Sequence, residues 1–247
     1  MTSLLHNPEP LFRVDGQPVG LVRDALRLEV EETTAGLKTL QFELLAQGDE
    51  SAPGGGVLYL DGPPLDFGKT IEVELGSGDQ ARTVFKGTIS ALEATFEEGR
   101  EAHVRVFAED ALMKLRLSRR FRTYENMTDA QIAEELARLN GLRAEADVTG
   151  GPSYEYVQQW NQSDLAFLRE RARLVNAEIW ERDGVLHFKS RTQRQGTELT
   201  LVRGGDLISL QVRADLAHQR TQVTVSGYDQ RARDVVQHSA GDRKSVV

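Results

Sequence analysis

The amino-acid sequence predicts an α+β protein that is mainly β, with strand-rich segments on either side of a helix-containing insert. Two observations predict this class. Segments near both ends of the chain alternate apolar and polar residues, which is typical of strands with one buried face. Helical spacing of apolar residues is confined to the middle of the chain, from about residue 128 to residue 175.

The N-terminal part is expected to form several short strands. Alternating segments occur at 23–31, 40–44, 71–75, 84–92 and 102–107. In the first of them the alternation places Leu26, Leu28 and Val30 on one face. Loop-forming stretches at 48–56 and 61–64 separate the strands. Short strands at this spacing predict a small barrel or a sandwich.

The middle of the chain is expected to form two helices. Thr128, followed three residues later by a Gln, has the arrangement of a capping box. Asn140, followed by a Gly, suits a left-handed helix end. A second helix is expected to begin at Ser163 and to pack one apolar face on a sheet. The apolar residues of that face are Leu165, Leu168, Ala172 and Val175.

The C-terminal part returns to strand patterns. Residues 177–182 and 185–188 flank Asp183 and Gly184, a two-residue loop suited to a type I′ hairpin turn. Further strands are expected at 198–202, 207–212 and 221–226. Strands on both sides of the helical insert would allow two similar barrels.

Composition excludes several classes of function. The chain has 247 residues, 39% hydrophobic and 28% charged, which is enough to form a real core. It has no cysteine, so disulfides, thiol nucleophiles and thiolate metal sites are excluded. The net charge of −8 disfavours nonspecific DNA binding, although a local basic patch at 116–122 is left open. Neither a transmembrane helix nor a signal peptide is expected.

Motifs that could carry chemistry are weak. Residues 76–81 match the loose dinucleotide pattern G-x-G-x-x-A, but a strand and not a helix is expected after them, so a hairpin loop is the better interpretation. Residues 53–56 lack the ending of a phosphate loop, and 126–128 fit a glycosylation acceptor without a secretion signal. No metal-binding spacing occurs among the histidines, which are His6, His103, His187, His218 and His238. We therefore expect no catalytic, metal-binding or cofactor-binding residue and no cofactor.

Three large aromatic residues are expected in the core and not at an interface. They are Trp160, Phe167 and Trp180. Side chains of this size gain on the order of a few kcal/mol from burial, which favours an interior position.

Several segments, in order along the chain, carry a resemblance to a known family. Residues 84–93 contain an F-x-G-x-I strand, and 121–124 form a basic-aromatic strand before the first helix, which ends in Gly-Leu. Residues 159–168 match Q-x-x-x-S-D-x-x-F-L, and 223–229 match V-x-V-x-G-x-D. Together these motifs, over about residues 80–230, resemble the late control gene D proteins of phages and the N-terminal hub part of VgrG spike proteins.

The resemblance implies a structural baseplate hub of a contractile phage tail or a phage-derived contractile injection system, with no enzymatic activity. Such hubs are homotrimers in which each chain contributes two tube-like β-barrels to a pseudo-sixfold ring. The corresponding division here is a first barrel at 1–115, an α/β insert with strand, helix and hairpin at 116–196, and strands of a second barrel at 197–247. The implied partners are the tail tube protein, a spike or spike-tip protein and other baseplate proteins, with no specific nucleic acid.

The implied location is assembly in the bacterial cytoplasm, followed by incorporation into a phage tail or injection particle. VgrG spike proteins continue into a needle, whereas this sequence ends just after the hub-like part; a separate spike chain and a missing remainder both stay open. Two other functions stay open as well. One is a tail-associated cell-wall hydrolase, for which no catalytic stretch is visible. The other is a carbohydrate- or protein-binding β-module, which should expose aromatic residues, although aromatics make up only 6% of this chain.

Overall fold

The computed structural model is mainly β with a few helices, and the predicted α+β class is confirmed. It describes residues 9–48, 56–60, 62–76, 81–194, 196, 200–205, 207, 209–212 and 221–241. The chain forms two compact units, residues 1–197 and 198–247.

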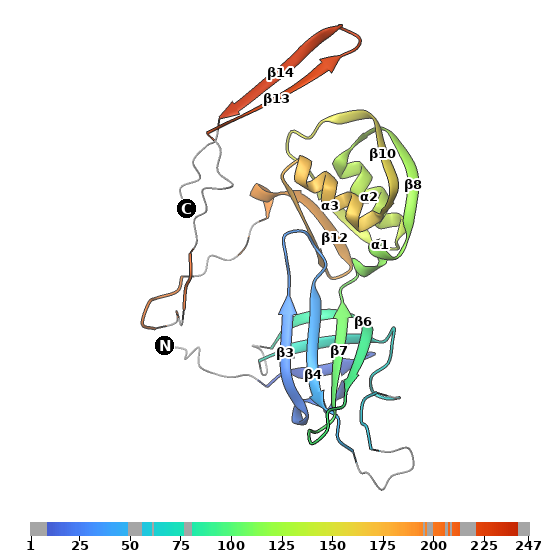
Figure 1. The fold of residues 1–247 in the computed structure, drawn as a ribbon, viewed down its shortest axis with the longest axis vertical. Coiled ribbons are helices and arrows are strands. Elements are labelled where there is room, and N and C mark those ends of the chain that lie inside the picture. Colours follow the sequence, from blue (N-terminus) through green and yellow to red (C-terminus); the bar gives the residue numbers. More distant parts are fainter. Residues whose placement is uncertain are drawn as a thin grey trace. The chain divides into compact units, whose positions relative to one another are not determined.

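The first unit begins with a seven-stranded antiparallel sheet (Figure 1). Its strands are β1 (Leu11–Val14), β2 (Gln17–Val19), β3 (Ala25–Glu31), β4 (Thr39–Leu45), β5 (Thr70–Leu75), β6 (Arg82–Thr95) and β7 (His103–Glu109). Their spatial order is β2-β1-β5-β6-β7-β4-β3. The predicted alternation holds in β4, where Leu40, Phe42 and Leu44 are almost completely buried. The buried face of the sheet forms its own hydrophobic core.

The sheet is open in the part of the chain that the structure describes. The end strands β2 and β3 are joined by a short 3-10 helix, η1 (Leu21–Arg23), and each pairs with one neighbour only. The segment predicted to form the first barrel therefore forms an open sheet in its described residues.

One face assignment in the first predicted strand is wrong. Leu26 was expected beside Leu28 and Val30, but its side chain is 55% exposed. The pairing of β3 with β4 shifts between Ala25 and Arg27, and such a bulge changes the face on which the preceding side chain lies. Leu28 and Val30 pack against the core as predicted.

The α/β lobe follows the sheet within the first unit (Figure 1). It contains α1 (Met113–Leu117), β8 (Arg119–Thr128), α2 (Asp129–Leu139), β9 (Arg143–Asp147), β10 (Ser153–Ser163), α3 (Asp164–Leu174), β11 (Ala177–Arg182), β12 (Val185–Ser190) and η3 (Arg191–Gln193). Strands β8 and β10 form an antiparallel ribbon, and β11, β12 and β9 form a second small sheet. The order strand, helix, strand thus occurs twice, from β8 to β9 and from β10 to β11.

The predicted helix and turn positions are confirmed. The side chain of Thr128 accepts a hydrogen bond from the Gln131 N–H, and the capping box is complete. Gly141 has a φ of +69°, as a left-handed helix end requires. Ser163 caps α3, and Asp183 and Gly184 both have positive φ in the β11–β12 turn.

The second unit contains an antiparallel hairpin of β13 (Gln222–Asp229) and β14 (Asp234–Gly241). The strand predicted at 221–226 is confirmed, while β14 was not predicted. The strands predicted at 198–202 and 207–212 are wrong for the described residues of those segments, which show only an isolated bridge between Arg203 and Leu207. Apolar residues alone do not make a strand where no neighbouring strand supplies the ladder of hydrogen bonds.

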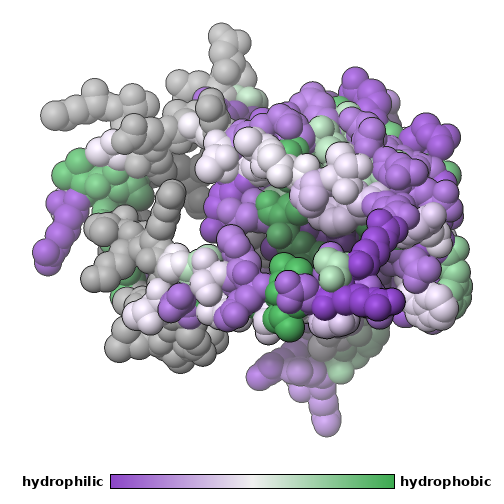
Figure 2. Space-filling model, turned by 90° about the horizontal axis from the view of Figure 1, so that it is seen from above, coloured by the Kyte–Doolittle hydropathy of each residue, from purple (hydrophilic) through white to green (hydrophobic). Residues whose placement is uncertain are grey.

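Hydrophilic side chains dominate the face of the molecule shown in Figure 2, and hydrophobic ones form separate patches there. Among the described helices, none is long and apolar enough to span a membrane.

Candidate functional site

The described part of the chain contains no group of three His, Asp or Glu side chains that could hold a metal ion. His103 and His187 lie in strands, as expected. The Nδ1 atom of His103 lies 3.0 Å from Glu43, and the His187 ring stacks on Trp180 with centroids 4.9 Å apart. His6 and His218 lie outside the described residues. His103 and His187 thus have structural neighbours, while His238 lies exposed in strand β14 (Asp234–Gly241).

The β3–β4 loop, residues 32–38, joins the sheet to the α/β lobe. Its Thr34 carbonyl accepts a hydrogen bond from the Ile179 N–H at 3.1 Å. Arg169 of α3 donates to the carbonyls of Ala35 at 2.8 Å and Gly36 at 3.0 Å. One guanidinium therefore holds two successive carbonyls of a loop more than 130 residues away in the sequence.

Gly36 allows this loop to approach the lobe closely. Its φ is +74°, a region that disfavours side chains. A Cβ at this position would lie 3.0 Å from Leu112 Cδ1 and 3.1 Å from the Ile179 carbonyl oxygen. The junction between sheet and lobe is therefore tightly packed at this glycine.

Asp110 fixes the other side of the junction. One of its carboxylate oxygens accepts from the Lys38 N–H at 2.8 Å and the other from the Leu112 N–H at 2.9 Å. The side chain is only 2% exposed. Burial raises its pKa to about 6, with a smaller contribution from nearby Glu181, although the two N–H donors act in the opposite direction.

The stability of the folded protein is expected to depend on pH through Asp110. The pKa of this carboxyl is higher in the folded protein than its ordinary value of 3.8, so the folded state binds the proton more tightly. The free energy of unfolding should fall by on the order of 2 kcal/mol as the pH rises from about 4 to about 6. The reference is Asp110→Asn, which does not titrate in this range, and urea unfolding of both proteins measures the difference. A difference that is flat or rises with pH would contradict the assignment.

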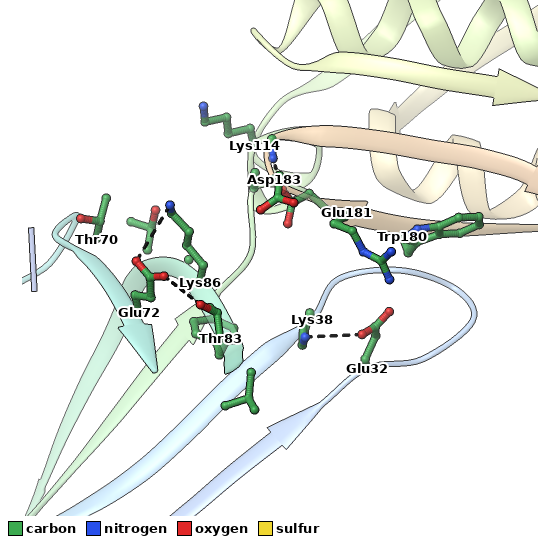
Figure 3. A pocket seen from close by; sticks show the side chains of 17 residues that line it. Glu32, Lys38, Thr70, Glu72, Thr83, Lys86, Lys114, Trp180, Glu181 and Asp183 are labelled. Carbon is green, nitrogen blue, oxygen red and sulfur yellow. Dashed lines mark hydrogen bonds and ion pairs between the residues drawn. The ribbon is translucent and has the colours of Figure 1, made fainter. Parts of the chain in front are cut away.

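A cleft of about 760 Å³ lies between strands β5 and β6 and the β11–β12 hairpin (Figure 3). Its charged lining residues are Glu32, Glu72, Glu181, Asp183, Lys38, Lys86, Lys114 and Arg182. Lys38 lies 3.6 Å from Glu32, and Lys86 lies 3.9 Å from Glu72. Burial raises the pKa of Glu181. The lining offers ionic contacts of both signs, and within it the Thr83 hydroxyl donates a hydrogen bond to Glu72 at 3.0 Å.

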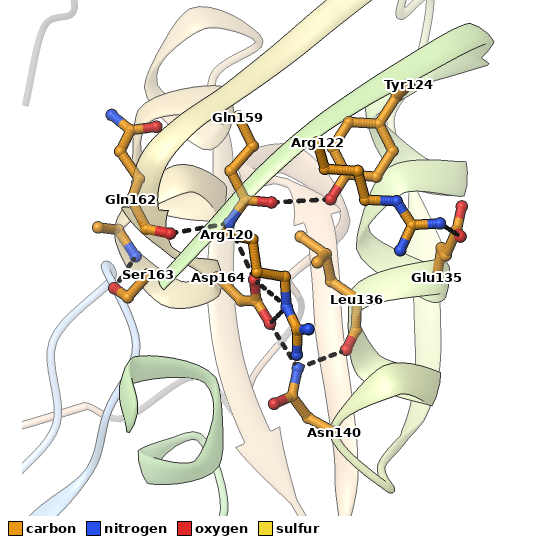
Figure 4. A network of polar contacts seen from close by, with 11 residues as sticks. Arg120, Arg122, Tyr124, Glu135, Leu136, Asn140, Gln159, Gln162, Ser163 and Asp164 are labelled. Atoms are coloured by element: carbon orange, nitrogen blue, oxygen red, sulfur yellow. Dashed lines mark hydrogen bonds and ion pairs between the residues drawn. The ribbon is translucent and has the colours of Figure 1, made fainter. Parts of the chain in front are cut away.

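A polar network around Asp164 holds the start of α3 (Figure 4). Asp164 is fully buried and accepts hydrogen bonds from Arg120 at 2.9 Å, Asn140 at 2.8 Å and Gln159 at 2.9 Å. The amide oxygen of Gln159 in turn accepts from the Tyr124 hydroxyl at 2.9 Å. Burial raises the pKa of Tyr124 to about 12, so this hydroxyl remains a donor at neutral pH.

A second buried carboxylate holds the start of α2 in the same way. Asp129 is 1% exposed and accepts from Arg171 at 2.6 Å and from the Tyr154 hydroxyl at 3.0 Å. The Arg171 guanidinium also lies 4.4 Å from the centre of the Tyr154 ring. Helices α2 and α3 thus both begin with a capping hydroxyl, followed by a buried aspartate that binds an arginine from another element.

The motif residues of the α3 region have structural roles. Ser163 accepts from the Ala166 N–H, and Gln159 and Asp164 belong to the network of Figure 4. Phe167 is 2% exposed and stacks on Tyr124, while Trp180 is 9% exposed, so both core predictions are confirmed.

The prediction for Trp160 is wrong, because its side chain is 70% exposed. It lies on the outward face of the β8–β10 ribbon, and its ring meets that of Phe121 with centroids 5.6 Å apart. Alternation along β10 buries Val157 and Gln159 and turns Trp160 outward.

The possible basic patch at 116–122 is largely neutralised. Its arginines contact acceptors of the same chain: Arg116 with Glu109, Arg119 with the Asn161 carbonyl, Arg120 with Asp164 and Arg122 with Glu135. This segment therefore contributes ion pairs within the fold.

The sequence patterns did not single out Gly36, Asp110 or Arg169. Their partners across the junction lie far away along the chain, and no local sequence pattern marks them. These residues connect the sheet and the lobe.

A family model described as the Alg8 N-terminal domain matches residues 61–246. The chain belongs to this family. This family is not the one that the sequence motifs resemble, which is that of the late control gene D proteins. No curated protein sequence matches the chain.

Solved structures show what fold this member of the family has. The 43 kDa tail protein of prophage MuSo2 from Shewanella oneidensis is 15% identical, with a TM-score of 0.69 over 97% of this chain and 70% of that one. The tail protein from Neisseria meningitidis MC58 is 14% identical, with a TM-score of 0.63 over 97% and 68%. An E. coli protein described as a component of the type VI secretion system is 19% identical, with a TM-score of 0.51 over 88% and 56%. The fold is therefore related to that of phage tail proteins.

Proposed function

We propose that the chain is the structural hub of a contractile phage tail or a phage-derived contractile injection system. The observation that carries the proposal is the fold likeness to a prophage tail protein over 97% of the chain. The ordered motifs from Phe85 to Asp229 support the same role, as does the likeness to a type VI secretion component. In this role the chain transmits mechanical force between the tube and the spike and lets cargo pass through the ring. It performs no chemical step.

The proposed assembly is a homotrimeric ring that joins a sixfold tail tube to a threefold spike. Three chains can match a sixfold tube only if each chain presents two similar surfaces, so that the threefold ring offers six similar contacts. We propose the seven-stranded sheet, within residues 1–115, as the first of these surfaces and residues 197–247 as strands of the second. The α/β lobe at 116–196 would then lie outside the tube-forming parts.

The β13–β14 hairpin has the polarity that a barrel strand pair needs. Val223, Val225 and Val236 lie on one face and are 52%, 67% and 57% exposed. The opposite face is polar except for the Tyr228–Val235 pair next to the turn, and Thr224 and Ser239 hydrogen-bond there at 2.8 Å. A valine face of this kind is stabilised when another sheet or a second chain covers it.

A pair of hairpin variants tests the proposal. Val223→Asp places a charge on the valine face, opposite Ala240, and should abolish trimer formation, because an unpaired charge is costly at a buried interface. Ser226→Asp adds the same charge to the polar face and should leave the trimer intact. Native mass spectrometry of the full chain, co-expressed with its tube and spike proteins, measures both. Equal assembly of the two variants, or no trimer in the wild type, would overturn the proposal.

A further inference from the structure

The outward face of the β8–β10 ribbon carries a line of side chains in three cross-strand pairs. The pairs are Phe121 with Trp160, Thr123 with Gln158, and Glu125 with Tyr156. The register is unbroken through these pairs, so all six side chains lie on one face of the ribbon. We call these six residues the aromatic strip.

The aromatic residues of the strip are exposed although the ribbon beneath them is well packed. Phe121 is 67% exposed, Trp160 70% and Tyr156 61%. On the inner face Tyr124 and Val157 are buried. Since the ladder of pairs is continuous from Tyr156 to Trp160, the rings are displayed by paired strands and not by a loop.

The polar residues in the centre of the strip are available to a ligand. Neither Thr123 nor Gln158 makes a side-chain hydrogen bond to another residue that the structure describes. A hydroxyl and an amide supply donors and acceptors of both kinds. They stand between the Phe121–Trp160 pair and the Tyr156 ring, which is about 13 Å from Trp160 along the strand at the usual rise per residue.

We propose that the aromatic strip binds a neutral polysaccharide of β-linked pyranose units. The apolar C–H faces of such sugars can stack on exposed aromatic rings, and Thr123 and Gln158 can bond sugar hydroxyls between the stacked units. Trp160 and Tyr156 would contact units in different places along the glycan chain. This binding activity is additional to the proposed hub function and does not depend on it.

The size of the strip favours a glycan over a protein partner. Aromatic side chains bury about 150–250 Å² each, so three rings exposed to this degree offer roughly 300–500 Å². A stable protein interface needs about 800 Å² from each partner. The strip provides about half of that area, whereas stacking of a few sugar rings requires no more.

Charge disfavours a nucleic acid on this surface. The ribbon's Arg120 and Arg122 lie on the inner face and pair with Asp164 and Glu135. The one charged member of the strip, Glu125, is acidic. Single-stranded nucleic acids require several cations beside the stacking rings. Only Arg119 lies at the end of the strip, with its guanidinium donating to the Asn161 carbonyl at 2.6 Å, so the strip matches an uncharged polymer.

Fluorescence of the full chain tests the proposal with two defined probes, the β-1,4-linked hexamers of N-acetylglucosamine and of glucose. The chain has two tryptophans, and Trp180 is buried, so quenching by iodide reports mainly on Trp160. At least one hexamer should shift the emission to the blue and protect it from iodide. In calorimetry, Tyr156→Ala and Gln158→Ala should weaken binding of that hexamer by about three- to tenfold, and Trp160→Ala by about tenfold or more.

Phe67→Ala is the matched control, because Phe67 is 63% exposed and lies outside the strip. It should bind like the wild type, and circular dichroism should show that all variants are folded. The proposal is overturned if neither hexamer binds at millimolar concentration, or if Phe67→Ala weakens binding as much as Trp160→Ala. It is also overturned if the strip variants change only binding of oligothymidine or self-association.

Discussion

The Gly87→Ala variant is expected to unfold at a temperature about 8–16 °C below that of the wild type. A Cβ at this position would lie 2.2 Å from the Glu109 carbonyl oxygen and 2.6 Å from the Phe85 ring. Neither neighbour can move freely, since Glu109 pairs with Thr88 across the ladder and Phe85 is 1% exposed in the core. Separating β6 from β7 here should lower the free energy of unfolding by on the order of 4 kcal/mol.

Gly99→Ala is the matched control for this substitution. Gly99 has a φ of +76°, and no atom lies within 4 Å of its would-be Cβ. It should lose only about 1 kcal/mol, the cost of a side chain in the left-handed region. Differential scanning calorimetry compares the two variants. If Gly87→Ala melts within a degree or two of Gly99→Ala, the close approach of β6 and β7 is not the reason for a glycine in the F-x-G-x-I strand.

The Asp164→Ala variant is expected to lose about 3–5 kcal/mol of stability. The substitution leaves three donors without their acceptor: the Arg120 guanidinium and the amides of Asn140 and Gln159. Gln159 is 1% exposed, so water cannot easily replace the lost carboxylate. Loss of this network should loosen α3 from the ribbon before the sheet unfolds.

Glu93→Ala is the control for Asp164→Ala. Glu93 pairs with Arg105 at 2.9 Å, but both side chains are substantially exposed, and such pairs contribute at most about 1 kcal/mol. Urea unfolding gives the two free energies, and hydrogen exchange of α3 amides shows where the effect is located. A loss below about 1 kcal/mol for Asp164→Ala would show that its network is replaceable.

Local features of the fold could be predicted from the sequence because neighbouring residues determine them. The Thr128 capping box, the start of α3 at Ser163 and the Asp183-Gly184 turn each depend on a few adjacent residues. The failures have a common cause. Size predicts a buried position for Trp160, and alternation predicts one for Leu26, but strand pairing and a bulge decide which face is buried.

Most contacts of the candidate site could not be predicted from sequence patterns. Arg169 and the Ala35 carbonyl lie 134 positions apart, and Asp164 and Arg120 lie 44 apart. The spacing of residues within one strand or helix does not predict contacts between residues this far apart in the sequence. Gly87 lies outside these contacts. A glycine inside a strand can mark a close backbone approach, and the structure shows one between Gly87 and the Glu109 carbonyl.

The most direct test of the proposed hub is electron microscopy of the full chain purified with its tube and spike proteins. We expect a ring with threefold symmetry and a central channel, in which the seven-stranded sheet and the β13–β14 hairpin of each chain alternate around the channel. A particle without threefold symmetry, or a chain that stays monomeric at micromolar concentration with both proteins present, would contradict the proposal.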